Sequence, residues 1–301
     1  HPEATAPDVW TLRTAAISVA VDARRAFLIG LAPAGSSNLL ASPVSSPSSP
    51  GRNSPAGWIW PVPESAWASL RAQGRWPEVV FNSPAWTGRA WRTRSGAAFC
   101  RWHREFDAPL CARATRTIRV SPYTASLEIE DRWERTGDTS VPLGPATVFR
   151  FANPVRVLLP AREDGVLVRP IAFAPPPAFA WRVIADVWTY RTDLGGEHRV
   201  ESLAEDRPWA AVEVPGWLVL LRATPRPTPD RVRFHSRAYV HRAARVAEIE
   251  LVAEGAELPA GTVLVSSTLM ECLPLAPRSS AETLATRVRL LAGEPDTPSP
   301  Q

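Results

Sequence analysis

Residues 248–275 read EIELVAEGAELPAGTVLVSSTLMECLPL, and the fold class follows most directly from these letters. Apolar residues occupy mostly alternate positions before and after the sequence Leu258-Pro259-Ala260-Gly261. An alternation of period two is typical of a β-strand that buries one face, and Pro with Gly marks a turn. The stretch therefore predicts two long antiparallel strands joined by a turn.

The same pattern extends over most of the chain. Short β-rich runs are bounded by Pro, Gly, Asp or Ser, as at Thr136-Gly137-Asp138. Helices are predicted only at residues 281–291, which have amphipathic spacing, and over two turns at residues 63–70. Such a succession of short strands predicts an all-β protein, a large antiparallel β-sandwich with few short helices. The predicted strands span residues 10–21, 26–31, 99–106, 110–120, 125–134, 141–151, 155–159, 165–168, 180–184, 187–191, 209–214, 216–223, 232–239, 246–253 and 262–272.

A second distinctive stretch, residues 57–81, reads GWIWPVPESAWASLRAQGRWPEVVF and holds Trp58, Trp60, Trp67 and Trp76. Its prolines prevent a regular core helix. An indole on a stiff loop offers a flat apolar face that suits a sugar ring, while its N–H finds a partner. Two interpretations stay open: the stretch is a ligand surface, or it is a plug that closes one end of a sandwich.

The composition argues against two classes of protein. Of the 301 residues, 34 are Lys or Arg and 30 are Asp or Glu, which gives a net charge of +4. Every basic residue is Arg, and the arginines are scattered rather than gathered in the stripe that a phosphate-following surface needs. We therefore expect no nucleic-acid partner. No run of about 18 apolar residues is present, so no membrane span is expected.

The 3 cysteines, Cys100, Cys111 and Cys272, fit neither a zinc site nor a disulfide framework. Free buried thiols are favoured slightly over one bridge between Cys100 and Cys111. The sequence starts at His1 and contains 1 Met, so we interpret it as a chain that has lost its first segment. Removal of a secretory signal is preferred over simple trimming. This preference predicts a secreted or periplasmic protein.

The length allows one large β domain with a sizeable core. We predict a disordered N-terminus at residues 1–9, a single domain at residues 10–292 and a disordered tail at residues 293–301. Residues 34–56 (AGSSNLLASPVSSPSSPGRNSPA) form a Ser/Pro/Gly run that cannot bury enough apolar area to order itself. This run is predicted to be a mobile loop that holds Leu39 and Leu40.

Three stretches together resemble a known family. They are residues 60–67 (WPVPESAW), residues 107–110 (DAPL) with residues 116–160 (RTIRVSPYTASLEIEDRWERTGDTSVPLGPATVFRFANPVRVLLP), and residues 248–275. The family comprises poorly characterised secreted bacterial proteins and is grouped with the galactose-mutarotase-like β-supersandwich superfamily. The resemblance covers residues 10–275 and rests mostly on strand and turn patterns.

This resemblance implies a β-supersandwich and a carbohydrate ligand. The superfamily includes aldose epimerases and the β-sandwich domains of polysaccharide lyases and of some glycoside hydrolases. Its epimerases open and reclose a sugar ring with a His as acid and a Glu as base. The present sequence departs from that pattern, because its histidines do not align with the epimerase His pair and Met270 stands where relatives have an aromatic residue. The resemblance therefore supports sugar binding more than any reaction.

Two histidines lie on polar strand faces, and histidine is the natural acid near neutral pH. His235 shares a face with Arg233, Arg237 and Tyr239 in RVRFHSRAY. His103 shares a face with Arg101 and Glu105 in FCRWHREF. Each face is a candidate ligand surface, and the alternative is the solvated side of an antiparallel sheet. His198 follows two glycines and is expected in a surface loop.

Carboxylates are the other source of acid–base chemistry. Glu64 lies among the tryptophans of residues 57–81, where it could bond sugar hydroxyls or move a proton. Glu271 lies in the apolar strand SSTLMECLPL, and apolar surroundings favour the protonated carboxyl that a general acid needs. An ion pair between Glu271 and an arginine is the favoured alternative. Glu250 alternates with apolar residues, as in an ordinary strand.

These observations predict an extracytoplasmic protein that binds an oligo- or polysaccharide without turning it over. The rival interpretations are an aldose-epimerase-like or lyase-like enzyme that uses His and Glu, and a structural or partner-binding sandwich. No cofactor and no metal site are predicted, although calcium stays open because it needs no local motif. The predicted acid–base residues are His235, His103, Glu271 and Glu64; the predicted ligand-binding residues are Trp58, Trp60, Trp67, Trp76, Arg101, Arg233, Arg237 and Tyr239.

Overall fold

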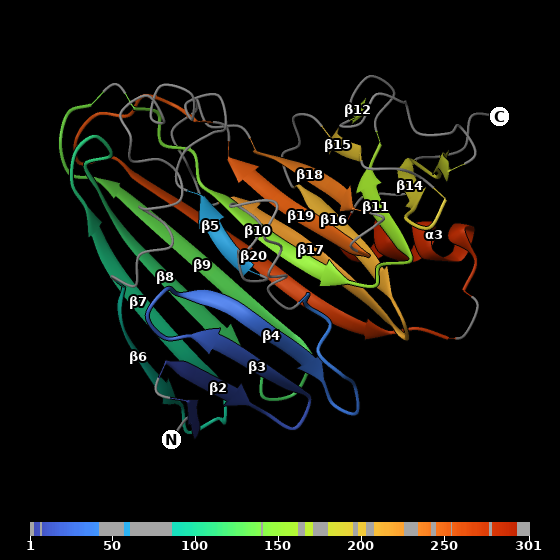
Figure 1. The fold of residues 1–301 in the computed structure, drawn as a ribbon, viewed down its shortest axis with the longest axis horizontal. Helices are drawn as coiled ribbons and strands as arrows, with labels where there is room; N and C mark the ends of the chain where they lie inside the picture. The colour runs from blue at the N-terminus through green and yellow to red at the C-terminus, as the bar shows by residue number, and fades with distance from the viewer. Residues whose placement is uncertain are drawn as a thin grey trace.

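Burial alternates along the strands of the computed structural model, and this alternation builds two large antiparallel sheets packed face to face (Figure 1). Each sheet has 10 strands within the described part of the chain. The structure describes residues 3–6, 8–41, 57–60, 86–139, 141–161, 166–170, 180–194, 198–202, 208–225, 234–241, 245–253, 255–276 and 279–293.

The first sheet joins the two ends of the chain. Its strand order is β1-β2-β3-β4-β5-β10-β19-β18-β15-β12, so that an N-terminal meander meets C-terminal strands across β5 and β10. Its strands are β1 (Glu3–Ala6), β2 (Val9–Arg13), β3 (Ile17–Asp22), β4 (Phe27–Pro33), β5 (Gly57–Trp60), β10 (Ala146–Ala152), β12 (Val166–Pro170), β15 (His198–Ser202), β18 (Phe234–His241) and β19 (Val246–Ala253).

The second sheet has the order β13-β14-β11-β16-β17-β20-β9-β8-β7-β6. The long strand predicted from residues 262–272 is β20, and it lies at the centre of this sheet between β17 and β9. The strands are β6 (Thr87–Arg92), β7 (Ala98–Phe106), β8 (Ala112–Val120), β9 (Ser126–Arg135), β11 (Arg156–Pro160), β13 (Trp181–Ile184), β14 (Val187–Arg191), β16 (Trp209–Val214), β17 (Trp217–Pro225) and β20 (Val263–Pro274).

The main core lies between the sheets. The first sheet contributes residues such as Phe149 and Ile249, and the second contributes residues such as Ile129 and Leu221, all of them without exposed surface. A smaller apolar cluster lies on the outer face of the second sheet, where the helix α3 (Ala281–Ala292) packs on β14, β16 and β17. The predicted all-β sandwich with one late helix is confirmed.

The structure differs from the prediction at the N-terminus. The single strand predicted at residues 10–21 is wrong, because β2 and β3 are separated by a turn at Thr14, whose Oγ1 accepts a hydrogen bond from the backbone N–H of Ile17 at 3.3 Å. A side chain that bonds its own backbone in this way offers an alternative to a continued strand. Residues Glu3–Ala6, within the segment predicted to be disordered, form β1 and pair with β2.

Part of the predicted mobile loop reaches the core. Leu39 and Leu40 are both buried, and Leu40 forms a β-bridge with Phe151 of β10. The remainder of that loop, the helix predicted at residues 63–70 and the tail beyond residue 293 lie outside the described residues.

All three cysteines are free thiols. Cys100 is buried on β7 and Cys272 is buried on β20, where burial raises the pKa of the Cys272 thiol to about 12. The bridge considered between Cys100 and Cys111 is not formed.

Candidate functional site

The outer face of the first sheet, which points away from the second sheet, carries a group of charged side chains. Ala238 on β18 and Ile249 on β19 are buried in the core, so the residues that alternate with them point to the outer face. The strand register places Glu201 of β15, Arg237 of β18 and Glu250 of β19 in one cross-strand row.

Arg237 is the centre of this group. Its Nη2 donates to Oε1 of Glu201 at 3.0 Å, and its Nη1 donates to Oε2 of Glu250 at 3.0 Å. Nε2 of His235 lies 2.9 Å from the same Oε1 of Glu201. We call Glu201, His235, Arg237 and Glu250 the Arg237 cluster. Its guanidinium holds together two carboxylates that would otherwise repel each other.

The two carboxyl groups of the Arg237 cluster differ in acidity. The hydrogen bond from His235, together with the charge of Arg237, holds the pKa of Glu201 well below its usual range. Burial raises the pKa of Glu250 in spite of the opposite effect of Arg237. Glu201 is therefore a fixed anion, whereas Glu250 is the carboxyl better suited to take up a proton.

A second row of polar residues lies beside the first. It runs from Arg199 of β15 through Tyr239 of β18 and Glu248 of β19 to Arg150 of β10. Nε of Arg150 donates to Oε1 of Glu248 at 2.9 Å, and Nη2 of Arg150 bonds the same oxygen. The polar face thus spans four neighbouring strands.

The groups of this face are not equally accessible. His235 is 4% exposed and Glu201 is 8% exposed, so both lie at the bottom of the site. Arg237, Tyr239 and Glu250 are half-buried and form its accessible surface. Nδ1 of His235 is buried and makes no hydrogen bond within the described part of the chain. The accessible groups offer both donors and acceptors, which is the combination that sugar hydroxyls require.

An apolar area adjoins the charged area on the same face. Trp60 packs on Phe27 and Val148, with Ile29 beside them. The register places Trp60, Ala146, Val252 and His235 in one row across β5, β10, β19 and β18. Three strand spacings of about 4.8 Å put Trp60 about 14 Å from His235.

The structure brings together only part of the predicted site. Trp60, His235, Arg237 and Tyr239 share the outer face of the first sheet, whereas only the backbone of Trp58 is described. Residues Arg233, Glu64, Trp67 and Trp76 lie outside the described residues.

Three predicted site residues lie on the other sheet. Arg101 and His103 are exposed on the outer face of β7. Glu271 lies on β20 and pairs with Arg222 of β17, which is the alternative that the sequence favoured. Because strand alternation identifies a face but not a sheet, it could not separate His103 from His235.

Four residues of the polar face were missed in the sequence, namely Arg150, Arg199, Glu201 and Glu248. Glu201 and Arg199 belong to β15, which begins at His198, a residue predicted to lie in a surface loop. The available signal was the alternation in HRVES after Gly195-Gly196, which is short but has the period of a strand.

The arrangement of strands resembles that of several solved protein structures. A galactose mutarotase-like protein from Lactobacillus casei superposes with a TM-score of 0.55 at 11% identity, covering 88% of this chain and 100% of the other. A galactose mutarotase related enzyme from Lactobacillus acidophilus gives a TM-score of 0.57 at 9% identity, covering 90% and 99%. The fold is galactose mutarotase-like. This confirms, at the level of fold, the resemblance drawn from the sequence.

Among the comparisons with known proteins, only the structural ones find this fold. No protein-family model and no curated protein sequence matches the chain. A galactose mutarotase-like protein from Clostridium acetobutylicum, with a TM-score of 0.52, is only 8% identical, with 89% of this chain and 95% of the other covered. At this identity the likeness concerns the arrangement of strands, and the chemistry has to be argued from the residues of this chain.

Two features are absent from the residues that the structure describes. Among them no helix combines the length and the hydropathy needed to cross a bilayer. They contain no group of three or more His, Cys, Asp or Glu side chains placed to hold a metal ion.

Proposed function

We propose that this galactose mutarotase-like protein binds a carbohydrate on the outer face of its first sheet. The observation that carries the proposal is the Arg237 cluster, in which a half-buried guanidinium and a half-buried carboxyl lie 3.0 Å apart beside a tyrosine. Such a pair can donate to one sugar hydroxyl and accept from its neighbour, and charge-assisted hydrogen bonds are the stronger ones. Like the family it resembles, the protein is proposed to work outside the cytoplasm.

The apolar area around Trp60 supports the same ligand class. A pyranose has a C–H face that packs on an indole and hydroxyls that need polar partners. Trp60 and Arg237 lie on one face, about three strand spacings apart. That separation suits a ligand of more than one sugar ring, so we propose an oligosaccharide or the end of a polysaccharide.

Acid–base catalysis is the second candidate, because the Arg237 cluster contains a histidine and a carboxyl group with a raised pKa, that of Glu250. Two features favour binding without turnover. His235 is 4% exposed, and its Nε2 is already engaged by Glu201, so it has no free ring nitrogen at the accessible surface. Glu250 is held by Arg237, which stabilises the carboxylate in one position.

The test is isothermal titration of the protein with mono- and oligosaccharides, followed by titration of Glu250→Gln. The substitution keeps the size of the side chain but removes a charged hydrogen bond, so we expect affinity to fall about tenfold or more. Glu105→Gln, an exposed carboxylate on β7, is the matched control and should bind as the wild type does. Thermal unfolding of each variant confirms that the fold is kept.

Two results would contradict the proposal. In one, no saccharide in the panel binds the wild type; in the other, Glu250→Gln and Glu105→Gln bind equally well. Nuclear magnetic resonance exchange between the anomers of a bound free sugar separates the two candidate functions. Anomer exchange that the protein accelerates, and that His235→Asn abolishes while binding persists, would favour the enzyme over the binding protein.

A further inference from the structure

The outer face of the second sheet carries a row of aromatic and charged side chains that ends at a leucine. The register aligns Leu269 of β20, Glu128 of β9, Arg119 of β8, Phe99 of β7 and Trp91 of β6. We call these five residues the Trp91 row. Four strand spacings of about 4.8 Å make it about 19 Å long. It points away from the first sheet, so it is separate from the Arg237 cluster.

One end of the Trp91 row is an aromatic platform. The rings of Trp91 and Phe99 stack with centroids 5.3 Å apart and an angle of 9° between their planes. The guanidinium of Arg89 lies 5.2 Å from the centroid of Trp91, and that of Arg119 lies 5.8 Å from the centroid of Phe99. Both rings are half-buried, so each keeps an accessible part. Stacking and the two guanidinium groups fix both rings in place, so their accessible parts can meet a ligand without rearrangement.

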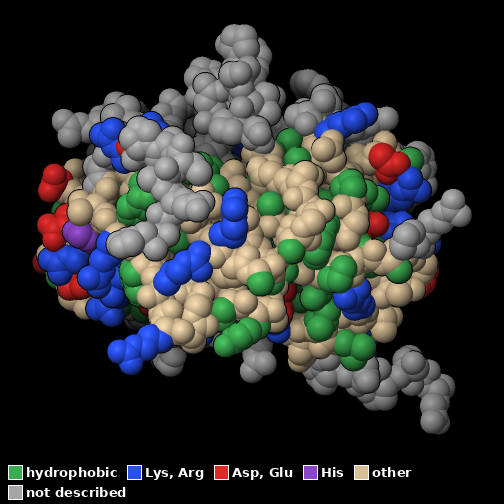
Figure 2. Space-filling model, turned by 90° about the horizontal axis from the view of Figure 1, so that it is seen from below, with side chains coloured by type: hydrophobic (Ala, Val, Ile, Leu, Met, Phe, Trp, Pro, Cys, Tyr) green, Lys and Arg blue, Asp and Glu red, His purple; other side chains and the backbone are tan. Residues whose placement is uncertain are grey.

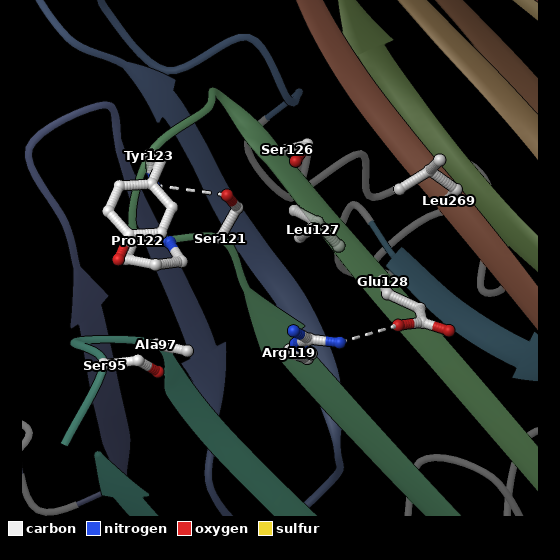
Figure 3. A pocket seen from close by; sticks show the side chains of 10 residues that line it. All are labelled: Ser95, Ala97, Arg119, Ser121, Pro122, Tyr123, Ser126, Leu127, Glu128 and Leu269. Atoms are coloured by element: carbon white, nitrogen blue, oxygen red, sulfur yellow. Dashed lines mark hydrogen bonds and ion pairs between the residues drawn. The ribbon is translucent and has the colours of Figure 1, made fainter. Parts of the chain in front are cut away.

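The other end of the Trp91 row opens into a pocket of about 290 Å³ (Figure 3). Its walls combine the apolar side chains of Leu269 and Pro122 with the ion pair of Arg119 and Glu128. Nη1 of Arg119 lies 3.8 Å from Oε2 of Glu128, and both side chains are more than one third exposed. Because the ion pair is long and exposed to solvent, Arg119 keeps donors and Glu128 keeps acceptors that a ligand can reach.

Tyr123 stands at the rim of this pocket with 80% of its surface exposed (Figure 3). The turn that carries it is held by Ser121, whose Oγ accepts from the backbone N–H of Tyr123 at 3.3 Å and from that of Thr124 at 3.1 Å. An exposed aromatic ring on a hydrogen-bonded turn loses little freedom when it meets a ligand. The ring of Tyr123 is therefore open to a ligand at the rim of the pocket.

We propose that the Trp91 row and its pocket form a second glycan-binding site, independent of the Arg237 cluster. One pyranose ring enters the pocket, with its C–H face on Tyr123 and Pro122 and its hydroxyls on Arg119 and Glu128. The next rings of the chain continue along Phe99 and Trp91. The alternation of aromatic, cationic and anionic groups suits a neutral polyol, because Glu128 repels the phosphates that a nucleic-acid strand would bring.

The experiment is native gel electrophoresis in gels that contain hydroxyethylcellulose, xylan, galactomannan or pullulan. At least one polysaccharide should retard the wild-type protein. Each of Trp91→Ala and Tyr123→Ala should weaken that binding about twofold to tenfold, since one aromatic contact contributes that much. Arg113→Ala is the matched control. Arg113 is half-exposed on β8, the strand that carries Arg119, but it lies outside the Trp91 row. It should migrate as the wild type does.

The two proposed sites can be tested independently of each other. Glu250→Gln should keep its retardation by the polymer, because it alters only the first sheet. Retardation that is equal in wild type, Trp91→Ala and Tyr123→Ala would overturn the second site, as would retardation by single-stranded DNA and by none of the polysaccharides. Tyr123 is exposed, so Tyr123→Ala should unfold at the same temperature as the wild type. That result would show that its weaker binding does not come from unfolding.

Discussion

Single residues decide how the two sheets of this sandwich hold polar groups in their interior. Arg116 of β8 has no exposed surface, and its Nε lies 3.4 Å from Oδ1 of Asp131 on β9. Oγ1 of Thr147, on β10 of the opposite sheet, donates to Oδ2 of Asp131 at 3.2 Å. Burial raises the pKa of Asp131 although Arg116 opposes the shift. Removing either charged partner alone would leave the other buried and uncompensated.

Glu201 provides a prediction at the same scale. Its pKa is lowered in the folded state, so its ionised form stabilises the fold above the unfolded-state pKa, and this contribution is lost as the pH falls through the folded-state pKa. Relative to Glu201→Gln, the wild type should be more stable near neutral pH. That advantage should shrink below about pH 4, where the unfolded carboxyl takes up its proton. Urea unfolding of both proteins over a pH series measures the difference.

The control for this pH dependence is Glu105→Gln, because Glu105 is exposed and paired only at the surface. Its difference from the wild type should stay small at every pH. An advantage of the wild type over Glu201→Gln that grows on acidification would contradict the lowered pKa. The pKa of Glu250 is raised, so its effect on stability has the opposite pH dependence. As the pH rises and Glu250 ionises, its buried charge lowers the stability of the fold.

At the scale of elements, α3 is the one helix in the described residues, and its ends are well defined. The Oγ of Ser280 accepts from the backbone N–H of Thr283 at 3.2 Å, and Gly293 ends the helix with a φ of 79°. Leu284 and Val288 are fully buried against Trp209 and Leu220. The helix therefore covers an outer part of the second sheet that would otherwise expose apolar surface (Figure 1).

The burial of α3 predicts a clear difference between two leucines of the same helix. Leu284→Ala should lower the free energy of unfolding by about 2–5 kcal/mol, because it leaves a cavity between the helix and the sheet. Leu290→Ala, at a position 57% exposed, should change it by less than about 0.5 kcal/mol. Urea denaturation followed by fluorescence measures both. Equal effects would mean that the helix does not pack as described.

Elements also show what the sequence could predict. The bounds of β14, β16 and β19 agree with the predicted strands, because each is a clear alternation between turn residues. Strand β15 was missed, because five residues after two glycines give too short a pattern. The inward position of Arg116 was readable in principle, since it alternates in phase with Ile118, but a charge inside a core contradicts the usual pattern.

At the scale of the whole molecule, the two proposed binding surfaces lie on the two outer faces of the sandwich. The sequence grouped Arg101 and His103 with His235, but the first two lie on the second sheet and the third lies on the first. Which strands become neighbours depends on pairings between distant segments, such as β10 with β19, and alternation carries no information about them. On the face shown in Figure 2, acidic and basic side chains are mixed at both ends of the molecule.

The place of β5 in the first sheet has a consequence for slow internal motion. In the described residues, no strand between β4 and β10 pairs with β4 along its whole length. Strand β5 pairs with β4 only at Leu28 and Gly57. Residues 39–41 add backbone hydrogen bonds to Leu31 and Arg150. Cooperative units of a protein open where such connections are weakest. Amide hydrogen exchange should therefore release the amides of β2, β3 and β4 together, before those of β9 and β19, as a single N-terminal block.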